Sequence, residues 1–199
     1  PIKRRANVSI PCRKPAKTMS QELKKFAAAR DAQIASYTGN NGFQARSLDW
    51  VLEAMNERNV YNFDWAGRPV IQYPQDIVAM QAIEWATRPD IIVETGIAHG
   101  GSLALSASLL TLLDVAAAAQ AGAMLDPSKP KRKVVAVDID IRAHNRALIE
   151  AHPFANAMEL IEGSSIDAEI HAQVMSHIPK GARVLVCLAS NHTPAHVMA

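Results

Sequence analysis

The stretch that decides the fold is Ile91-Ile92-Val93-Glu94-Thr95-Gly96-Ile97-Ala98-His99-Gly100-Gly101-Ser102. A short apolar run ends in an acid, a glycine loop follows, and an alanine- and leucine-rich segment begins where that loop ends. This order predicts a buried strand, a tight turn and a helix. Glycines let the backbone approach a ligand closely, and the first helical turn offers unpaired N–H groups at the positive end of the helix dipole. We therefore expect a polar or anionic, nucleotide-like ligand at this turn.

The glycine spacing separates this loop from two common nucleotide-binding loops. Gly96, Gly100 and Gly101 do not fit the dinucleotide pattern G-x-G-x-x-G, and no Gly-Lys-Ser/Thr of a P-loop follows them. The spacing instead resembles the E/D-x-G-x-x-x-G loop of class I S-adenosylmethionine (SAM) methyltransferases. The alternative is a strand-to-helix turn that uses its glycines for geometry alone.

Further apolar runs follow this one and alternate with helical patterns. Strands are predicted at residues 91–94, 134–138, 158–161 and 184–188. The alternation predicts an α/β fold, a Rossmann-like, doubly wound and mostly parallel sheet. In such sheets ligands bind beyond the carboxyl ends of the strands. Polar groups follow each of the four predicted strands, which favours one shared site at that edge.

Upstream of the sheet, the sequence predicts an appendage. Residues 1–17 contain six basic residues and three prolines, and we expect an irregular arm there. A helix is predicted from Thr18 to Tyr37, because Thr18 and Gln21 fit a capping box. A loop then leads to a second helix that Ser47 caps.

Three later segments complete the expected elements: a loop, a helix, and an irregular stretch after the helix that follows the glycine loop. The aromatic-rich residues 61–74 are expected to form a long loop, and a loop of this kind is often functional. A helix is expected from Gln75 to about Thr87. The helix after the glycine loop is expected to end near Leu113, followed by a poorly patterned stretch at residues 116–132.

The bulk composition favours a globular protein. The chain of 199 residues can form one domain with an appendage, since its 49% hydrophobic and 20% charged residues are typical of globular chains. A net charge of +2 indicates no nucleic-acid or membrane-surface partner. No signal-peptide pattern is present, and the longest apolar candidate, Leu103 to Leu125, is interrupted by polar residues, so we expect no membrane span. Cys187 reads as a packed thiol, which suggests a reducing, cytoplasmic compartment.

Several motifs in order resemble one known family. They are Trp65-x-Gly67, Pro74-x-Asp76, Glu94-Thr-Gly-x-x-His-Gly-Gly-Ser102, Asp138-Ile-Asp-Ile-Arg142, His152-Pro153, Glu162-Gly-Ser-Ser165 and Ser190-Asn-His-Thr193. The set resembles the cephalosporin hydroxylase family, which includes rhamnosyl O-methyltransferases and is similar to class I SAM methyltransferases. The resemblance implies a SAM-binding domain over residues 61–199, preceded by an arm and helices over residues 1–60.

The resemblance also implies how the glycine loop would hold SAM. Gly96 and Gly100 would let the loop wrap the methionine part of the cofactor, together with Gly101 and Ser102. Glu94 would accept a charge-assisted hydrogen bond from the methionine ammonium group.

Residues after the next two predicted strands would hold the nucleoside. Asp138 would take both ribose hydroxyls through its two oxygens, and the alternative is an acid at a helix N-terminus. Ser164 and Ser165 would lie at the adenine edge, and the alternative is a cap for a helix from Ile166.

The sequence departs from the family at the fourth predicted strand. The family has Leu-Asp-Ser there, and that Asp is a ligand of Mg²⁺, whereas this chain has Leu188-Ala189-Ser190. Alanine has no side-chain oxygen for a hard cation, so we expect no Mg²⁺ in this chain although the family uses it. The family's other acidic ligands lie on a later strand that this chain does not reach. Three explanations stay open: a fragment, completion by neighbouring protomers, or a degenerate relative.

The leading functional hypothesis is SAM-dependent O-methyl transfer to a hydroxyl of a sugar, a glycolipid or a small natural product. His192 or His99 would then be the base, since a neutral imidazole accepts a proton near pH 7. The alternatives are a catalytically silent module that binds SAM or a partner protein, and an NAD-type oxidoreductase, against which the glycine spacing argues. A homo-oligomer stays open.

Overall fold

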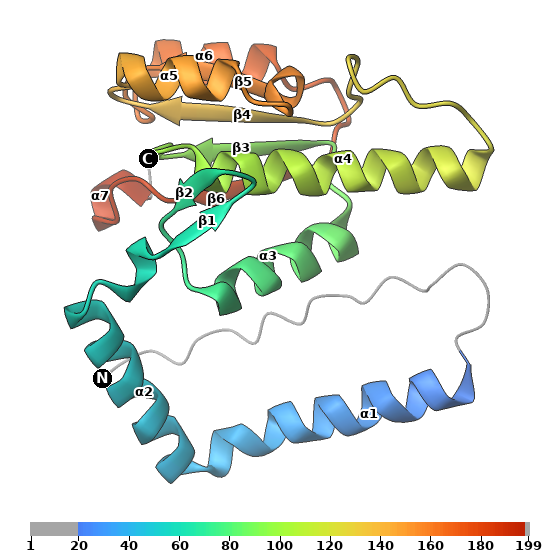
Figure 1. The fold of residues 1–199 in the computed structure, drawn as a ribbon, viewed down its shortest axis with the longest axis vertical. Helices are drawn as coiled ribbons and strands as arrows, with labels where there is room; N and C mark the ends of the chain where they lie inside the picture. The colour runs from blue at the N-terminus through green and yellow to red at the C-terminus, as the bar shows by residue number, and fades with distance from the viewer. Residues whose placement is uncertain (1–19, 198–199) are drawn as a thin grey trace. The chain divides into compact units, whose positions relative to one another are not determined.

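A four-stranded parallel sheet organises the larger of the two units of the chain (Figure 1). The computed structural model describes residues 20–197, with residues 195 and 196 as backbone only, and the two units are residues 1–59 and 60–199. The strands are β3 (Ile91–Thr95), β4 (Lys133–Asp138), β5 (Met158–Glu162) and β6 (Val184–Leu188), in the spatial order β5-β4-β3-β6. The predicted α/β fold with a parallel sheet is confirmed.

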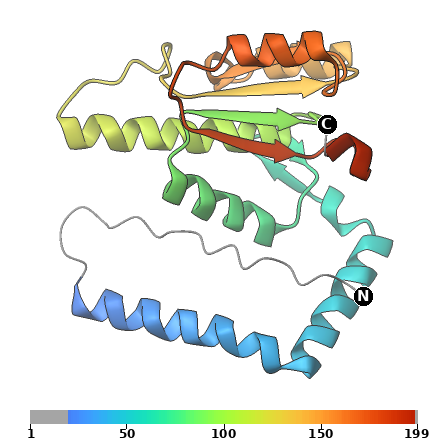
Figure 2. The same ribbon diagram turned by 180° about the vertical axis from the view of Figure 1, so that it is seen from behind.

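Helices cover both faces of the sheet, as in a doubly wound fold. Figure 1 shows α4 (Gly101–Ala121) and α5 (Ala143–Glu150) on one face, and Figure 2 shows α6 (Ala168–Ser176) on the other. α3 (Pro74–Thr87) packs against α4. Further short elements are η1 (Tyr37–Gly39), η2 (Asn59–Tyr61), η3 (Ala155–Ala157) and α7 (Pro194–Val197).

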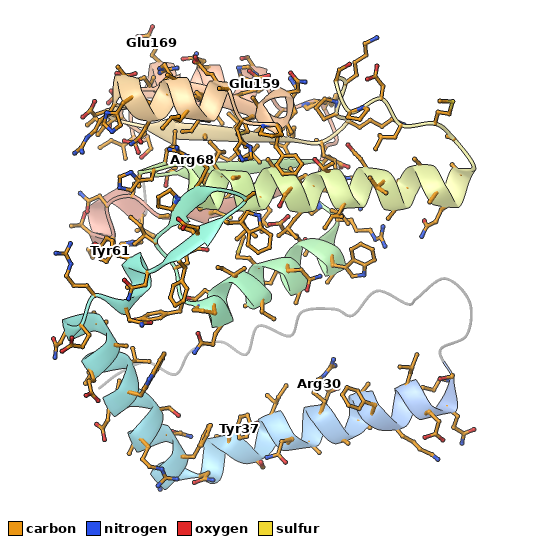
Figure 3. The ribbon with its side chains drawn as sticks, in the orientation of Figure 1. Arg30, Tyr37, Tyr61, Arg68, Glu159 and Glu169 are labelled. Carbon is orange, nitrogen blue, oxygen red and sulfur yellow. The ribbon has the colours of Figure 1, made fainter. Side chains whose placement is uncertain are left out.

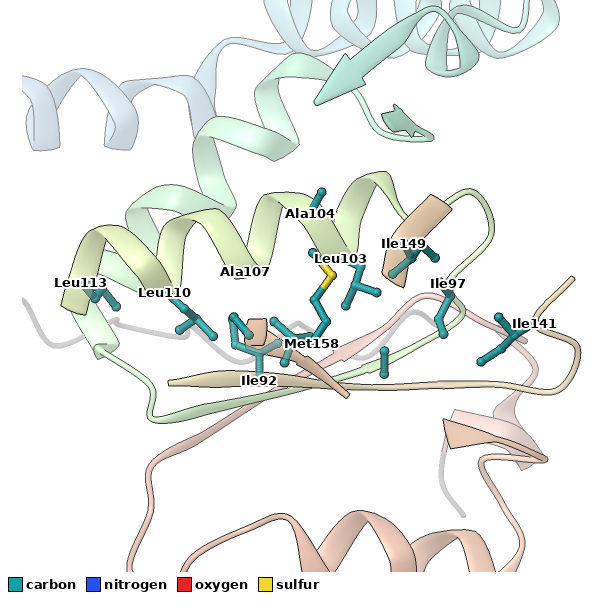
Figure 4. Close-up of a cluster of buried hydrophobic side chains, with 13 residues drawn as sticks. Ile92, Ile97, Leu103, Ala104, Ala107, Leu110, Leu113, Ile141, Ile149 and Met158 are labelled. Atoms are coloured by element: carbon teal, nitrogen blue, oxygen red, sulfur yellow. The ribbon is translucent and has the colours of Figure 1, made fainter. Parts of the chain in front are cut away.

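Alternate residues of the central strands fill two cores. Ile92 and Val134 belong, together with Leu110 of α4, to the core beneath that helix (Figure 4). Their strand neighbours Ile91 and Val135 belong to the core on the face that α6 covers. Because both faces are buried, these strands need apolar residues at nearly every position, which explains why they read as continuous apolar runs.

Helix α4 is longer than predicted and ends at Gly122, whose φ of 61° closes the helix in the left-handed conformation. Its last turns are alanine-rich, and alanine is the strongest helix former, so residues 116–121 of the stretch that we read as poorly patterned continue the helix, while the remainder of that stretch is irregular. Of the helices in the described residues, Gly101–Ala121 is the one long and apolar enough to cross a membrane, and half of its most apolar window is buried. A core helix of an α/β domain has these same properties.

In the smaller unit, the first helix is confirmed and the start of the second was predicted wrongly. α1 (Gln21–Ser36) is capped by Ser20, while Thr18 and the predicted arm lie outside the described residues. α2 (Asn41–Asn56) begins before Ser47, because the Asn40 side chain accepts a hydrogen bond from the Phe43 N–H at 3.0 Å. The composition of residues 38–46 had suggested a loop, but the Asn40 cap starts the helix within that segment.

The aromatic-rich segment before α3 is a hairpin rather than the predicted loop. β1 (Phe63–Trp65) pairs in antiparallel register with β2 (Arg68–Val70). The turn residues Ala66 and Gly67 have φ of 48° and 81°, as in the type I′ turns that join such strands. Three-residue strands give too short an alternation to be recognised in sequence.

Replacing Leu110 by alanine should destabilise the protein by about 2–5 kcal/mol, because the side chain is fully buried in the core of Figure 4. The matched control is Leu112→Ala, two residues along the same helix, where the side chain is 56% exposed and the loss should stay below about 1 kcal/mol. Urea unfolding measures both. Equal losses would contradict the assignment of the core face of α4.

Candidate functional site

The loops that follow the four parallel strands enclose a cavity of about 530 Å³. Its lining includes Gly96 after β3, Asp138 at the end of β4, and Ser164 and Ser165 after β5. Ser190 after β6 completes it. Four of the residues singled out in the sequence therefore meet in one place, at the edge where a doubly wound sheet binds its ligands.

Gly96 is required by the packing of one backbone segment on another. Its φ is 88°, and a Cβ there would lie 2.7 Å from the carbonyl oxygen of Ala189 and 2.9 Å from the Ser190 nitrogen. The Gly96 N–H donates to the Val137 carbonyl at 2.8 Å. The glycine thus lets the loop after β3 lie against the loop after β6. The space that a side chain would need is occupied by backbone atoms of the protein.

Gly100 and Gly101 also pack against protein atoms. A Cβ at Gly100 would lie 2.7 Å from the end of the Ile149 side chain, and one at Gly101 would lie 2.1 Å from the carbonyl oxygen of Pro69. Gly100 has a φ of 81°, and α4 starts directly after it, as expected. Neither glycine lines the cavity of about 530 Å³, although Gly101 and Ser102 line a second cavity next to it.

Asp138 ties the glycine loop to the end of β4. Its Oδ2 accepts from the Ile97 N–H at 2.6 Å and its Oδ1 from the Asp140 N–H at 3.1 Å. Each carboxylate oxygen can accept further hydrogen bonds, and the residue lines the cavity. The alternative role as a helix N-terminal acid is wrong, because α5 begins only at Ala143.

Ser164 and Ser165 do not cap the helix that follows them. α6 begins at Ala168 with Asp167 in the N-cap position, two residues later than the predicted start. The Ser164 carbonyl accepts from the Asp167 N–H at 3.0 Å, and the Ser165 carbonyl lies 2.6 Å from the His171 Nε2. Their backbones therefore shape the turn, and both residues line the cavity.

Glu94 lies beneath α4 and is not among the residues that line the cavity, and its expected contact with a ligand stays a prediction. It occupies the same face of β3 as Ile92, and its carboxylate accepts hydrogen bonds from Ser102 and Ser106, one turn apart on α4. Burial raises the pKa of Glu94 to about 7, and the two serine hydroxyls offset part of that rise. The residue fixes the start of α4 from below.

A second buried acid, Glu84 of α3, lies close enough to Glu94 to interact with it. Its side chain is 1% exposed, and burial first and the Glu94 charge second raise the pKa of Glu84 to about 8. Burial, together with both carboxylates, raises the pKa of the Cys187 thiol to about 12. Cys187 is a free thiol packed against the core, as predicted, and it stays protonated at neutral pH.

A second cavity, of about 480 Å³, shares the residues Gly96, Ala98 and Ala189 with the first. Both predicted catalytic residues, His99 and His192, line it, although they come from different loops. Both residues are exposed. Gln72, Asp76 and Ser102 add further hydrogen-bonding groups to the same lining.

Two residues that sequence reasoning missed hold the glycine loop from behind. Arg68, which Figure 3 labels on β2, donates through Nε to the His99 carbonyl at 2.8 Å and through Nη2 to the same oxygen. The Asn145 side chain donates to the Ala98 carbonyl at 3.0 Å. Both side chains are buried. A buried arginine or asparagine in an exposed-looking segment leaves no local signal, since its partners lie far away in the sequence.

Few side chains of the kinds that bind Mg²⁺ line these two cavities. In the part of the chain that the structure describes, Asp138 is the one carboxylate lining the first cavity, and Asp76 is the one lining the second. Within residues 20–197, no group of three His, Cys, Asp or Glu side chains is placed to hold a metal ion. Each cavity therefore has a single carboxylate in its lining, and Ala189, which lines both cavities, adds no side-chain oxygen.

Gly96→Ala should destabilise the protein more than Gly67→Ala. Both glycines have a φ above 80°, so each variant carries the strain of a left-handed alanine, about 1–2 kcal/mol. A Cβ at Gly67 would have no atom within 4 Å, whereas one at Gly96 meets backbone. Forcing the two loops apart should cost Gly96→Ala an additional ~1–3 kcal/mol in urea unfolding. Equal costs would contradict the close approach of the two loops.

The free energy of unfolding should fall as the pH rises from about 4.5 to about 8, because Glu84 keeps its proton in the folded state and loses it in the unfolded chain over that range. The slope from this group should reach about 1.4 kcal/mol per pH unit. Glu84→Gln should remove that slope and make the protein more stable than the parent at pH 8, with little difference at pH 4. Unfolding curves across pH measure it, and an unchanged slope in the variant would contradict the assignment.

Comparisons with known proteins agree with the family expected from the sequence. Three solved structures of CmcI are similar to the chain: one titled with Mg and SAM, one with SAH and one apo-structure, each 19% identical over 69% of this chain, with TM-scores of 0.45, 0.43 and 0.44. This chain covers 50%, 58% and 50% of those three, so it spans about half the length of the structures it matches. No curated protein matches significantly. The model of one family matches residues 57–199, and the chain therefore belongs to the rhamnosyl O-methyltransferase/CmcI family.

Proposed function

We propose that residues 61–199 form a SAM-binding domain and that the protein transfers the methyl group of SAM to a hydroxyl oxygen of a small acceptor. The observation that carries this proposal is the pair of cavities on one glycine loop. A cofactor cavity and an acceptor cavity must adjoin for direct transfer, and the two cavities here share Gly96, Ala98 and Ala189. Membership of the family and the SAM and SAH in the titles of similar structures support the same cofactor.

In this proposal SAM occupies the cavity of about 530 Å³, a volume within the usual range for small-molecule sites. The free acceptor capacity of the Asp138 oxygens suits the ribose hydroxyls, and Ser164 and Ser165 would flank the adenine. The backbone of the glycine loop would hold the methionine part. Glu94 would position the glycine loop indirectly, because its carboxylate accepts a hydrogen bond from Ser102 at the start of α4.

The acceptor would occupy the second cavity, where the protein positions its hydroxyl group and removes the proton. When bound, SAM supplies a methyl group on a sulfonium centre, which needs an oxygen nucleophile held in line. His192 or His99 would take the hydroxyl proton, since both line this cavity. The hydrogen-bonding side chains of Gln72 and Asp76 favour an acceptor rich in hydroxyls, such as a sugar, a glycolipid or a small natural product.

Activation of the acceptor in this proposal does not use Mg²⁺, because Ala189 provides no side-chain oxygen. The missing oxygen at Ala189 also supports a second candidate function, that of a module that binds SAM without turnover. We also propose a cytoplasmic location, which the free thiol Cys187 favours. A homo-oligomer is consistent with the exposed apolar residues Val186 and Leu188 on β6.

Titration calorimetry with SAM, its demethylated product SAH, methionine and NAD tests the proposal. The parent should bind SAM and SAH in preference to NAD. Asp138→Asn keeps an oxygen for the Ile97 N–H but loses the charge, so it should bind SAM and SAH about 10- to 100-fold more weakly and methionine nearly unchanged. Asp140→Asn, an exposed neighbour, is the control.

Preference for NAD, or an equal loss for methionine and SAM, would contradict the proposed cofactor site. SAM binding without transfer of a labelled methyl group to hydroxyl acceptors would favour the silent module over the enzyme.

A further inference from the structure

Strand β6 forms one edge of the parallel sheet, and half of its backbone groups point away from the sheet. The Ala189 N–H donates to the Thr95 carbonyl at 2.9 Å, and the Arg183 carbonyl accepts from the Ile91 N–H at 3.1 Å, so the odd-numbered residues of this segment bond to β3. The even-numbered residues then direct their N–H and C=O groups away from β3. Within the described residues, no other strand pairs with β6, which Figure 2 shows at the border of the sheet.

The even-numbered side chains of β6 are apolar and exposed. Val184, Val186 and Leu188 are 40%, 56% and 46% exposed, and they lie on the same sheet face as Val93, which packs in the core on the α6 side. The strand contains no charged residue, no proline and no glycine. An edge strand with these properties is a template for pairing with another strand.

The opposite edge of the sheet is charged. β5 carries two acids, Glu159, which Figure 3 labels, and Glu162, and they form ion pairs with Lys133 and Arg146. Charged side chains on an edge strand are one of the means by which proteins prevent pairing at that edge. The sheet therefore has one edge that is protected against pairing and one edge, β6, that is not.

We propose that β6 is a dimer interface, where it pairs in antiparallel orientation with β6 of a second copy of this chain. A two-fold axis at Val186 places this residue opposite itself and Val184 opposite Leu188, so every exposed apolar side chain of the strand meets another one. These three residues also carry the outward N–H and C=O groups, so the same register pairs the backbones of both strands. The two sheets become one continuous sheet with a charged β5 at each border, and assembly therefore stops at the dimer.

The same register brings the second copy next to the candidate functional site. Counting along the paired strands from Val186 places Ala189 opposite Arg183 of the second copy. Ala189 lines both cavities at the glycine loop. The second copy therefore lies beside the wall that the two cavities share.

Sedimentation velocity and amide hydrogen exchange of the whole chain test the proposal. The parent should sediment as a dimer at micromolar concentration, and the amides of Val184, Val186 and Leu188 should exchange slowly, as in paired strands. Val186→Lys places two like charges opposite each other at the two-fold axis, so it should weaken the dimer at least about tenfold and speed the exchange of the amides at 184 and 188. Because the Val186 side chain is already 56% exposed, the monomeric variant should remain folded.

The matched control is Val78→Lys, the same substitution at a position of α3 that is 66% exposed, and it should leave the dimer unchanged. A monomeric parent, a dimer that Val186→Lys does not weaken, or a dimer in which the three amides exchange freely would each overturn the proposal. A monomeric parent in which these amides exchange slowly would show in addition that another segment of the same chain covers β6.

Discussion

Position 96 has to be glycine because two backbone segments meet there. The loop after β3 lies against the loop after β6 with no room for a Cβ, and the Gly96 N–H is bonded to β4 through the Val137 carbonyl. Asp138 adds a second tie, from its carboxylate to the Ile97 N–H. These contacts join the ends of three strands, so the geometry of both cavities depends on them. A side chain at this position would separate the walls of the site before it touched any ligand.

The rest of the domain supports that junction from two sides. Glu94 holds the start of α4 through Ser102 and Ser106, while Arg68 and Asn145 hold the carbonyls of the glycine loop. Buried polar groups that are fully paired in this way make a loop rigid. A rigid loop between two cavities suits the proposed methyl transfer, because in-line transfer requires the cofactor and the acceptor to be held at a fixed separation.

Most of the fold and part of the site could be predicted from local patterns. The apolar runs and the glycine loop predicted the sheet, and the order of strand ends predicted that Asp138 and Ser164 would meet. Sequence could not predict Arg68, whose partners are far along the chain, or the hairpin that carries it, whose strands have three residues. The orientation of Glu94 was predictable in principle, because it shares a strand face with Ile92, and a helix with two serines one turn apart covers that face.

The most direct test of the account is a nuclear magnetic resonance titration of the labelled protein with SAH. The largest backbone shifts should fall on the residues that line the larger cavity at the ends of the four strands, which are residues 96, 98, 137–139, 163–165 and 189–191. Gln81, Glu84 and Trp85 of α3, which line a separate cavity between α3 and α4, should not respond. Shifts centred on α3, or no saturable shifts at the strand ends, would contradict it.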